Sequence, residues 1–343
     1  MPGKLFPAGS IVSTEMGLVR LGNVIQCHPG IGFMQRAAMF ANLKQRSHST
    51  QTVTKDDLSY VPASPPFSQE NINQLQDFVD KSKKLFVLTG AGLSTESGIP
   101  DYRSEGVGLY ARTNHRPMQY NHFLQSAERR RQYWARNFVG WRKYKSFVPN
   151  LSHTALSSWE KMCKINWLAT QNVDGLHLKA GSERVTELHG SLHRVKCLSC
   201  FNVISRNSLQ KQLIKLNPNF VIKQETMAGP DGDVLLSLED MKNFVVPECE
   251  ECGGILKPNI VFFGDNVQKT TVAFLKDRVR DADGFLVVGS SLQVYSGYRF
   301  ALEAAEWKKP IAIINIGPTR ADHLATLKIN AKLGDILPEV VVS

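Results

Sequence analysis

Residues 85–98 read Leu-Phe-Val-Leu-Thr-Gly-Ala-Gly-Leu-Ser-Thr-Glu-Ser-Gly. The short apolar run that stops at Gly90 is typical of a strand buried on both faces of a parallel sheet. Gly90 and Gly92 allow a tight turn and a close approach of the backbone to a ligand, and a helix after the turn would direct free N–H groups at a phosphate. Because Thr95 occupies the third glycine position of the dinucleotide fingerprint, a purely structural strand-to-helix turn stays an alternative.

Similar apolar runs recur along the chain, separated by amphipathic helical patterns. We expect strands at residues 165–169, 260–263, 285–288 and 311–314, and helices at 69–81, with Ser68 as the N-cap, 154–163 and 298–307. Strands that alternate with helices predict an α/β fold with a Rossmann-like parallel sheet covered on both faces. Ligands of such sheets bind beyond the carboxyl ends of the strands.

Two stretches break this alternation and predict a smaller inserted lobe. The first, residues 119–149, is helical, basic and aromatic, and the second, residues 191–256, is irregular and bracketed by cysteine pairs. We therefore expect a Rossmann-like lobe formed by residues 56–118, 150–190 and 257–343, with a helical module and a cysteine module forming the small lobe.

Four of the six cysteines form two Cys-x-x-Cys pairs, Cys197/Cys200 and Cys249/Cys252, which are separated by 48 residues. Two such pairs can supply four thiolates to a tetrahedral zinc ion that has no open position and is structural. A redox pair or two disulfides are the alternatives, but the repetition of the motif favours zinc.

Polar residues follow the expected strands. Gln171, Asn172, Val173 and Asp174 come directly after residues 165–169, and His189 stands beside a glycine. His189 is the best candidate for a general base, because the ordinary pKa of imidazole lies near neutral pH. The small residues at 289–291 and 315–317 would admit a nucleotide closely. A turn-rich loop at residues 98–104 has the composition of a ligand lid.

Charge is unevenly spread over the chain, whose formal net charge is +10. Residues 1–54 contain five lysines and arginines and a single acid, Glu15, and are rich in serine, threonine and alanine. This composition predicts that residues 1–55 are a mitochondrial presequence, with a disordered basic tail as the alternative. No apolar run approaches the roughly 18 residues that span a bilayer, so we expect no membrane association.

Taken together, these motifs resemble the sirtuin family. They occur in the family's order from about Val61 to Pro338 and read TGAGLS, GIPDYRS, TQNVD, ELHG, two CxxC pairs, VFFG, GSS and NIG. Finer stretches resemble a class II, mitochondrial branch of that family, among them PASPP, RSEGVGLYAR, RQYWARNFVGW and VGSSLQVYSGYRF. Two positions depart from the commoner family pattern, since Tyr102 replaces a phenylalanine and Ser290 a frequent threonine.

The resemblance implies an enzyme that uses NAD as a co-substrate and holds one structural zinc ion. It would remove acyl groups from protein lysines and release nicotinamide and an O-acyl-ADP-ribose. Lipoyl, biotinyl and branched carboxyacyl groups are favoured over acetyl. The expected partners are acyl-lysine-bearing proteins of the mitochondrial matrix, such as lipoylated or biotinylated metabolic enzymes and dehydrogenases.

The resemblance also implies roles for individual residues. His189 and Asn172 would be catalytic, with His189 taking a proton from a ribose hydroxyl, and Tyr102 would shield the reactive carbon from water. The acyl-lysine segment would contact Val261, Phe262, Gly264 and Arg112. The residues expected at NAD are Gly90, Ala91, Gly92, Ser94, Glu96, Ile99, Pro100, Asp101, Tyr102, Arg103, Tyr110, Gln171, Asn172, Val173, Asp174, Gly289, Ser290, Ser291, Asn315, Ile316, Gly317 and Leu333.

Two other functions fit parts of the sequence. The same residues could transfer ADP-ribose to mitochondrial proteins. Alternatively, basic and aromatic residues alternate between Arg129 and Lys145, beside the cysteine pairs, which suggests nucleic-acid binding. Because Trp134, Phe138 and Trp141 fall on one helical face, a core position explains them better, and we expect no nucleic-acid partner.

Overall fold

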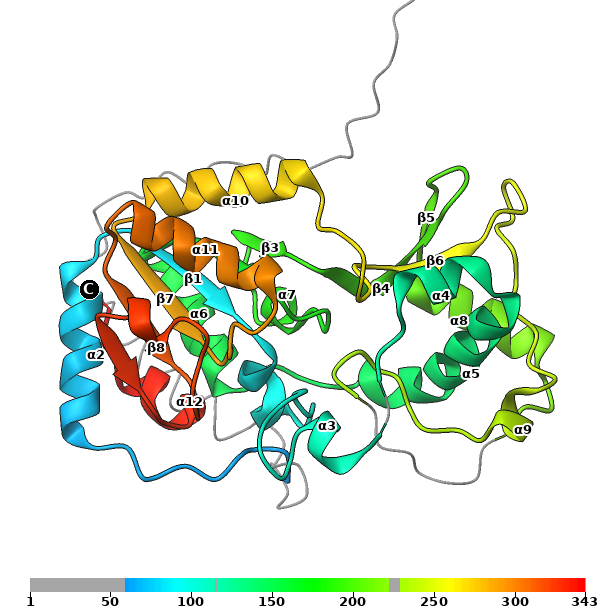
Figure 1. Ribbon diagram of the computed structural model, residues 1–343, viewed down its shortest axis with the longest axis horizontal. Coiled ribbons are helices and arrows are strands. Elements are labelled where there is room, and N and C mark those ends of the chain that lie inside the picture. Colours follow the sequence, from blue (N-terminus) through cyan, green and yellow to red (C-terminus); the bar gives the residue numbers. More distant parts are fainter. Residues whose placement is uncertain (1–58, 115, 222–228, 343) are drawn as a thin grey trace, which may run out of the picture. The chain divides into compact units, whose positions relative to one another are not determined.

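A parallel sheet covered by helices forms one part of the computed structural model, which describes residues 59–114, 116–221 and 229–342 (Figure 1). Its strand order is β3-β2-β1-β7-β8-β9, and all its neighbours are parallel. The order reverses between β1 and β7, which is the switch point where doubly wound sheets bind ligands. The strands are β1 (Leu85–Thr89), β2 (Ile165–Thr170), β3 (Val185–Glu187), β7 (Gly284–Val288), β8 (Ile311–Ile314) and β9 (Leu327–Ile329).

Helices cover both faces of this sheet, as the sequence predicts. Leu85 and Val87 of β1 pack in the cluster that includes residues of α2 (Gln69–Lys81), α6 (Leu151–Lys161) and α12 (Leu333–Ile336). Phe86 and Leu88 of the same strand pack toward α10 (Lys269–Asp281) and α11 (Tyr295–Glu306), which lie side by side in Figure 1. The strand is therefore apolar on both sides, which explains its uninterrupted run.

The predicted strand at residues 260–263 is wrong. Only Ile260 lies in a strand, β6 (Leu256–Ile260), and β6 pairs antiparallel with β4 (Gly190–Cys197) in a separate sheet. The apolar run continues past it because Phe262 is buried in another core, with its ring centroid 5.2 Å from that of Phe123 and 5.3 Å from that of Tyr133. β3 and β9 were not predicted, since each has three residues and is only partly buried.

Capping residues and backbone conformation determine where the helices begin and end. At the start of α2, the Ser68 hydroxyl accepts a hydrogen bond from the Asn71 N–H and the Asn71 side chain accepts one from the Ser68 N–H, as in a capping box. Asn150 caps α6, which therefore begins at Leu151, three residues before the predicted start, and the helix ends before Cys163, whose φ is 61°. The predicted helix after the glycine turn is a 3₁₀ helix (Ala91–Ser97), so the helix dipole expected there is small.

A second, antiparallel sheet has the order β5-β4-β6 and packs with its own helices. Trp134 and Trp141 of α5 are at most 2% exposed in this core, and the guanidinium carbon of Arg206 lies 5.5 Å and 4.9 Å from their ring centroids. The aromatic face of α5 is therefore core, as expected. The elements here are α4 (Tyr120–Gln125), α5 (Ala127–Tyr144), β4 (Gly190–Cys197), β5 (Val203–Ser205), α8 (Arg206–Leu216) and α9 (Leu238–Met241).

Among the described residues, no helix has both the length and the hydropathy needed to cross a membrane. The presequence predicted for residues 1–55 lies outside the described residues. The lobe boundaries expected from the sequence stay a prediction. The shorter elements are α3 (Leu109–Arg112), α7 (Leu176–Lys179), and the 3₁₀ turns Asp322–Leu324 and Leu337–Glu339.

Replacing Gly140 with alanine should destabilise the contact between α5 and residues 229–234. A Cβ on Gly140 would overlap the Gly232 carbonyl oxygen, so the backbone must shift. We expect a loss of about 1–3 kcal/mol in the free energy of unfolding, despite the better helix propensity of alanine. The measurement is urea unfolding, with the exposed Lys143→Ala on the same helix as control. An unchanged midpoint in Gly140→Ala would contradict this packing.

Candidate active site

Two turns lie in backbone contact where the strand order reverses. A Cβ on Gly90 would lie 2.7 Å from the Ser290 Cβ, and a Cβ on Gly92 would lie 2.9 Å from the Gly289 carbonyl oxygen. The Gly92 N–H also donates to that carbonyl at 2.9 Å. Glycine is required here because the turn after β1 must pack against the turn after β7 without side chains between them.

A cavity of about 1070 Å³ opens beside these turns and is lined by residues that follow the strand ends. Most residues singled out from the sequence line this cavity. They are Gly90, Ala91, Gly92, Ser94, Ile99, Asp101, Tyr102, Arg103, Gln171, Asn172, Val173, Asp174, His189, Val261, Phe262, Gly264, Gly289, Ser290, Ser291, Asn315, Ile316 and Gly317.

Five of the expected residues lie elsewhere. Glu96 and Leu333 line a smaller neighbouring pocket of about 30 Å³, where Glu96 Oε1 accepts a hydrogen bond from the Gly334 N–H at 3.1 Å. Burial raises the pKa of the Glu96 carboxyl. Pro100, Tyr110 and Arg112 line neither space. Arg112 instead packs over the Tyr60 ring, with its guanidinium carbon 5.0 Å from the ring centroid.

A buried hydrogen-bonded chain fixes the polar residues after β2. The Asn172 amide donates to the Gly90 carbonyl oxygen at 3.0 Å and to the Ser94 hydroxyl at 3.1 Å. The Ser94 hydroxyl donates to Asp174 Oδ2 at 2.7 Å. Burial raises the pKa of the Asp174 carboxyl, while bonds from the Leu176 N–H and Ser94 lower it. The glycine turn and the segment after β2 are thus held as one unit.

His189 is held in a defined tautomer. Its Nδ1 lies 2.8 Å from the Gln171 carbonyl oxygen, which can only accept, so Nδ1 carries the proton. Nε2 then has the lone pair and lies 2.7 Å from the Ser296 hydroxyl. Burial lowers the pKa of the His189 imidazole. The side chain is therefore a neutral base at neutral pH, with Nε2 as the accepting atom.

Asp101 organises the loop that closes one side of the cavity. Its Oδ1 accepts from the backbone N–H groups of Arg103 at 3.1 Å and Ser104 at 2.9 Å. Tyr102 packs between two rings, with centroids 5.7 Å from Tyr110 and 6.1 Å from Phe263. Tyr110 therefore supports Tyr102 from behind the cavity wall. Burial raises the pKa of the Tyr102 phenol well above its ordinary value.

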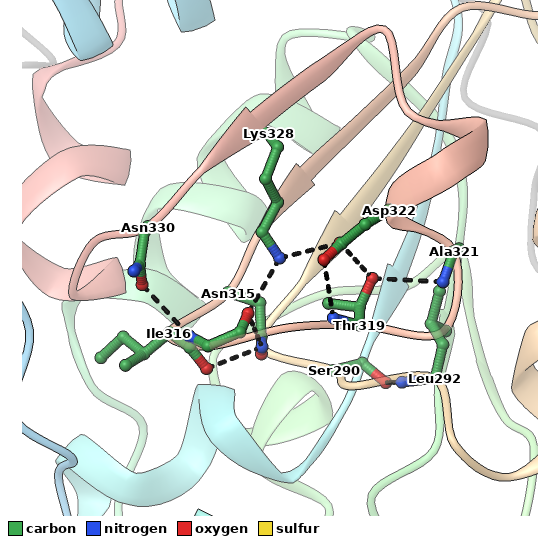
Figure 2. Close-up of polar contacts among 10 residues, drawn as sticks. Ser290, Leu292, Asn315, Ile316, Thr319, Ala321, Asp322, Lys328 and Asn330 are labelled. Carbon is green, nitrogen blue, oxygen red and sulfur yellow. Dashed lines mark hydrogen bonds and ion pairs between the residues drawn. The ribbon is translucent and has the colours of Figure 1, made fainter.

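The turn after β8 is stiffened by side chains of β9 and its flank, as Figure 2 shows. The Lys328 ammonium donates to the Gly317 carbonyl oxygen at 3.0 Å and pairs with Asp322 at 3.0 Å. The Gly317 N–H donates to the Asn330 side chain at 3.1 Å, and the Asn315 amide donates to the Ile316 carbonyl at 2.8 Å. β9, which was not predicted from the sequence, thus fixes one wall of the cavity.

Part of the segment expected to receive a substrate strand is already paired within the chain. The Val261 N–H donates to the His189 carbonyl oxygen at 2.8 Å, and the Phe262 carbonyl accepts from Asp265 at 3.0 Å. Phe263 pairs with the Gln119–Tyr120 segment through a Tyr120 N–H bond of 2.9 Å. These bonds fix the segment beside the cavity, with a turn at Gly264, and reduce the backbone groups that remain for a peptide.

Several cavity residues were not predicted from the sequence. Ser296, Tyr295 and Arg299 come from the start of α11, and Pro230 and Asp231 come from the segment between the cysteine pairs. The local sequence pattern does not indicate these residues, because a helix start and an irregular loop do not directly follow a strand of the parallel sheet. They reach the cavity only through the tertiary fold.

The four predicted cysteines converge, and their sulfur atoms all lie within 4.8 Å of one another. Cys197 and Cys252 have sulfurs 3.5 Å apart, and those of Cys200 and Cys249 are 3.7 Å apart. A tetrahedron with zinc–sulfur bonds of about 2.3 Å has edges of roughly 3.8 Å, so the thiolates fit a zinc ion. The metal would join the end of β4 to the residues that precede β6.

Two histidines are buried behind the glycine turn. The His177 Nε2 lies 3.0 Å from the Thr89 hydroxyl, the His153 Nδ1 lies 2.9 Å from the Asn150 side-chain oxygen, and the two rings are 4.9 Å apart. Burial lowers the pKa of His177 to about 3. Burial, and secondarily the neighbouring His177, lowers the pKa of His153 well below its ordinary value. Both imidazoles are therefore uncharged, and they fill the space behind the glycine turn.

Comparison with known proteins supplies the family. The sequence model of the Sir2 family matches residues 90–296, which span the glycine turn, His189 and all four cysteines. The chain belongs to the Sir2 family. The resemblance to sirtuins inferred from the motifs is thereby confirmed.

Similar members of the Sir2 family come from animals. The chain is 55% identical to the human "NAD-dependent protein lipoamidase sirtuin-4, mitochondrial", over 89% of this chain and 98% of that protein. It is 51% identical to "NAD-dependent protein deacylase Sirt4" of Drosophila melanogaster, over 87% of this chain and 95% of that protein. Among solved structures, "Sir2-p53 peptide-NAD+" shares 27% identity and a TM-score of 0.57, over 78% of this chain and 95% of that chain.

Removing one metal ligand should unfold the cysteine module. We expect the wild-type chain to carry one zinc ion, and Cys200→Ser to lose it and to unfold at a lower temperature, because a structural zinc site contributes directly to folding. Elemental analysis and thermal unfolding measure both effects. Phe201→Asn is the control, since Phe201 is exposed and asparagine tolerates its φ of 63°. Stoichiometric zinc in Cys200→Ser would contradict the assignment.

The buried histidines should make the fold sensitive to mild acid. Below pH 6.5 the unfolded chain binds a proton at His177 that the folded chain excludes until about pH 3, so stability falls as pH falls through this window. We expect His177→Gln to reduce the slope of unfolding free energy against pH by about 1.4 kcal/mol per unit between pH 6 and 5. Urea unfolding provides the slopes, and the two proteins should show equal slopes above pH 7. Equal slopes at pH 5–6 would be the contrary result.

Proposed function

We propose that this chain removes acyl groups from protein lysines in a reaction that consumes NAD. The observation that carries the proposal is His189, a neutral base with its Nε2 in the cavity at the switch point of the sheet. The names of the human and Drosophila relatives, a lipoamidase and a deacylase, support the same reaction. The residue roles that follow are part of this proposal.

The cavity is suited to NAD together with one extended acyl-lysine. Its volume of about 1070 Å³ lies at the upper end of the range for small-ligand sites. The side-chain-free turns at Gly90 and Gly289 allow a pyrophosphate to approach the backbone, and the turn at Asn315–Gly317 offers polar groups for a ribose. NAD supplies, when bound, an anomeric carbon that nicotinamide can leave.

The chain's own residues bind, orient and move one proton. His189 Nε2 accepts the proton of a ribose hydroxyl, and the Gln171 carbonyl holds the ring in the tautomer that permits this. Asn172 and Asp174 are fixed by Ser94 and the Gly90 carbonyl, so they hold the nicotinamide end without reorganising. Tyr102, packed on Tyr110 and Phe263, excludes water from the reacting carbon.

The acyl group that we propose is larger than acetyl, with lipoyl, biotinyl and branched carboxyacyl groups as candidates. Arg112, which the resemblance placed at the acyl-lysine segment, does not line the cavity. Asp231 lines it, and we assign to Asp231 the contact with the distal part of a long acyl chain. The name of the human relative, a lipoamidase, supports a lipoyl group.

The proposed location is the mitochondrion, and within it the matrix. The basic, acid-poor composition of residues 1–54 supports import, and the human and bovine relatives are named mitochondrial. Lipoylated and biotinylated metabolic enzymes and dehydrogenases, which carry acyl-lysines, would be the partners.

A panel of lipoyl-, biotinyl-, methylglutaryl- and acetyl-lysine peptides, incubated with NAD and analysed by mass spectrometry, tests the proposal. We expect free lysine and, as the first product, O-acyl-ADP-ribose, with acetyl turned over most slowly. His189→Ala should lower product formation at least about 100-fold, because a general base is lost. His122→Ala, an exposed histidine, is the matched control. ADP-ribose attached to the protein target in place of the acyl product would favour ADP-ribosyl transfer instead.

A further inference from the structure

In the structure a nucleophile, Ser296, is paired with a base, His189. The Ser296 hydroxyl lies 2.7 Å from His189 Nε2, and His189 Nδ1 lies 2.8 Å from the Gln171 carbonyl oxygen. Because Nδ1 carries the proton, the serine hydroxyl is the donor and the imidazole is the acceptor. A serine is activated as a nucleophile when its hydroxyl donates a hydrogen bond to a base that a third group orients.

Both residues face the cavity, and they come from separate elements. Ser296 is the second residue of α11 (Tyr295–Glu306), and His189 follows β3. Both line the same space, and the Gly297 and Tyr298 N–H groups of this first turn already donate to the Val294 carbonyl oxygen. A carbonyl that reached Ser296 would therefore meet the nucleophile and its base together.

The other cavity serines have different partners. Ser290 accepts a hydrogen bond from the Gln171 amide at 2.7 Å and another from the Leu292 N–H at 3.2 Å. Ser94 donates to the Asp174 carboxylate and is only 1% exposed. Of Ser94, Ser290 and Ser296, it is Ser296 that is hydrogen-bonded to an imidazole.

The proposed deacylation would place an ester next to this pair. His189 takes the proton from a ribose hydroxyl, and the acyl carbon becomes bonded to that same oxygen. Since Ser296 bonds the nitrogen that received the proton, the ester carbonyl forms within a few ångströms of the serine hydroxyl. We propose, on the basis of that function, that Ser296 and His189 are an esterase pair that cleaves O-acyl-ADP-ribose to ADP-ribose and the free acid.

The chemistry balances without a further co-reactant except water. The Ser296 oxygen attacks the ester carbonyl, and its proton passes to His189 Nε2. The bond from the acyl carbon to the ribose oxygen breaks, and that oxygen leaves with the proton from His189. Water then adds to the acyl-serine, again giving its proton to His189, and Ser296 regains a proton as the carboxylic acid departs. No electron is gained or lost overall.

The test uses p-nitrophenyl acetate with the full-length, zinc-loaded chain in the absence of NAD and acyl-peptide. We expect release of nitrophenolate and an acetyl ester that peptide mapping locates on Ser296. Ser296→Ala and His189→Ala should each lower the acylation rate at least about 100-fold. Ser146→Ala is the matched control, because this exposed serine lies outside the cavity, bonds only the Lys143 carbonyl oxygen, and its loss should leave labelling of Ser296 intact. Ser296→Cys, which keeps a nucleophile, should still be acylated.

The inference fails if the wild-type chain carries no adduct at residue 296, or if His189→Ala is acylated there at the wild-type rate. Mapping of the wild-type chain requires no variant, so a misfolded mutant does not affect the result. Incubation with O-acetyl-ADP-ribose gives a second readout, in which ADP-ribose should accumulate. Because neither assay includes NAD or acyl-lysine, failure here together with a successful peptide panel would overturn the esterase alone.

Discussion

The approach of two turns to within backbone contact is the constraint on which the cavity depends. The turn after β1 hydrogen-bonds the turn after β7 from Gly92 to the Gly289 carbonyl, and Gly90 has no room for a Cβ beside Ser290. The sheet order reverses between these two strands, so the contact lies where their following segments diverge. Side chains there would push the turns apart and fill the space that opens beside them.

Polar residues extend this constraint to the rest of the site. The Gly90 carbonyl accepts from Asn172, and Ser94 connects Asn172 to Asp174, so the segment after β2 follows the glycine turn. Gln171 in the same segment reaches Ser290 with its amide and His189 with its carbonyl. A shift of the turn would therefore move Asn172 and Asp174, which we propose hold the nicotinamide end, together with His189. The four cysteines have a different task, because they join β4 to the residues before β6 and take no part in this network.

The sequence predicted what is local, and missed what only the tertiary fold brings together. Residues 85–89 and 311–314 are strands with the predicted bounds, because a strand buried on both faces needs an unbroken apolar run. The apolar run at residues 260–263 led to a wrong strand prediction, because Phe262 is buried in the second core and not in a strand of the parallel sheet. β9 has no such run, although Lys328 and Asn330 at its end fix the turn at Gly317. Arg112 was expected at the acyl group from its position in the chain, but its side chain packs on Tyr60.

His189 has one lone pair, and this limits the order in which it can act. The Nδ1 proton is committed to the Gln171 carbonyl, so Nε2 cannot accept from Ser296 and from a ribose hydroxyl at the same moment. Entry of the ribose must turn the Ser296 hydroxyl away. Its bond to Nε2 can re-form only after the ribose oxygen has been acylated and Nε2 has passed the ribose proton to the departing lysine amine. One imidazole would thus serve two reactions in sequence, and the second would begin from the hydrogen bond that the cavity shows before the first.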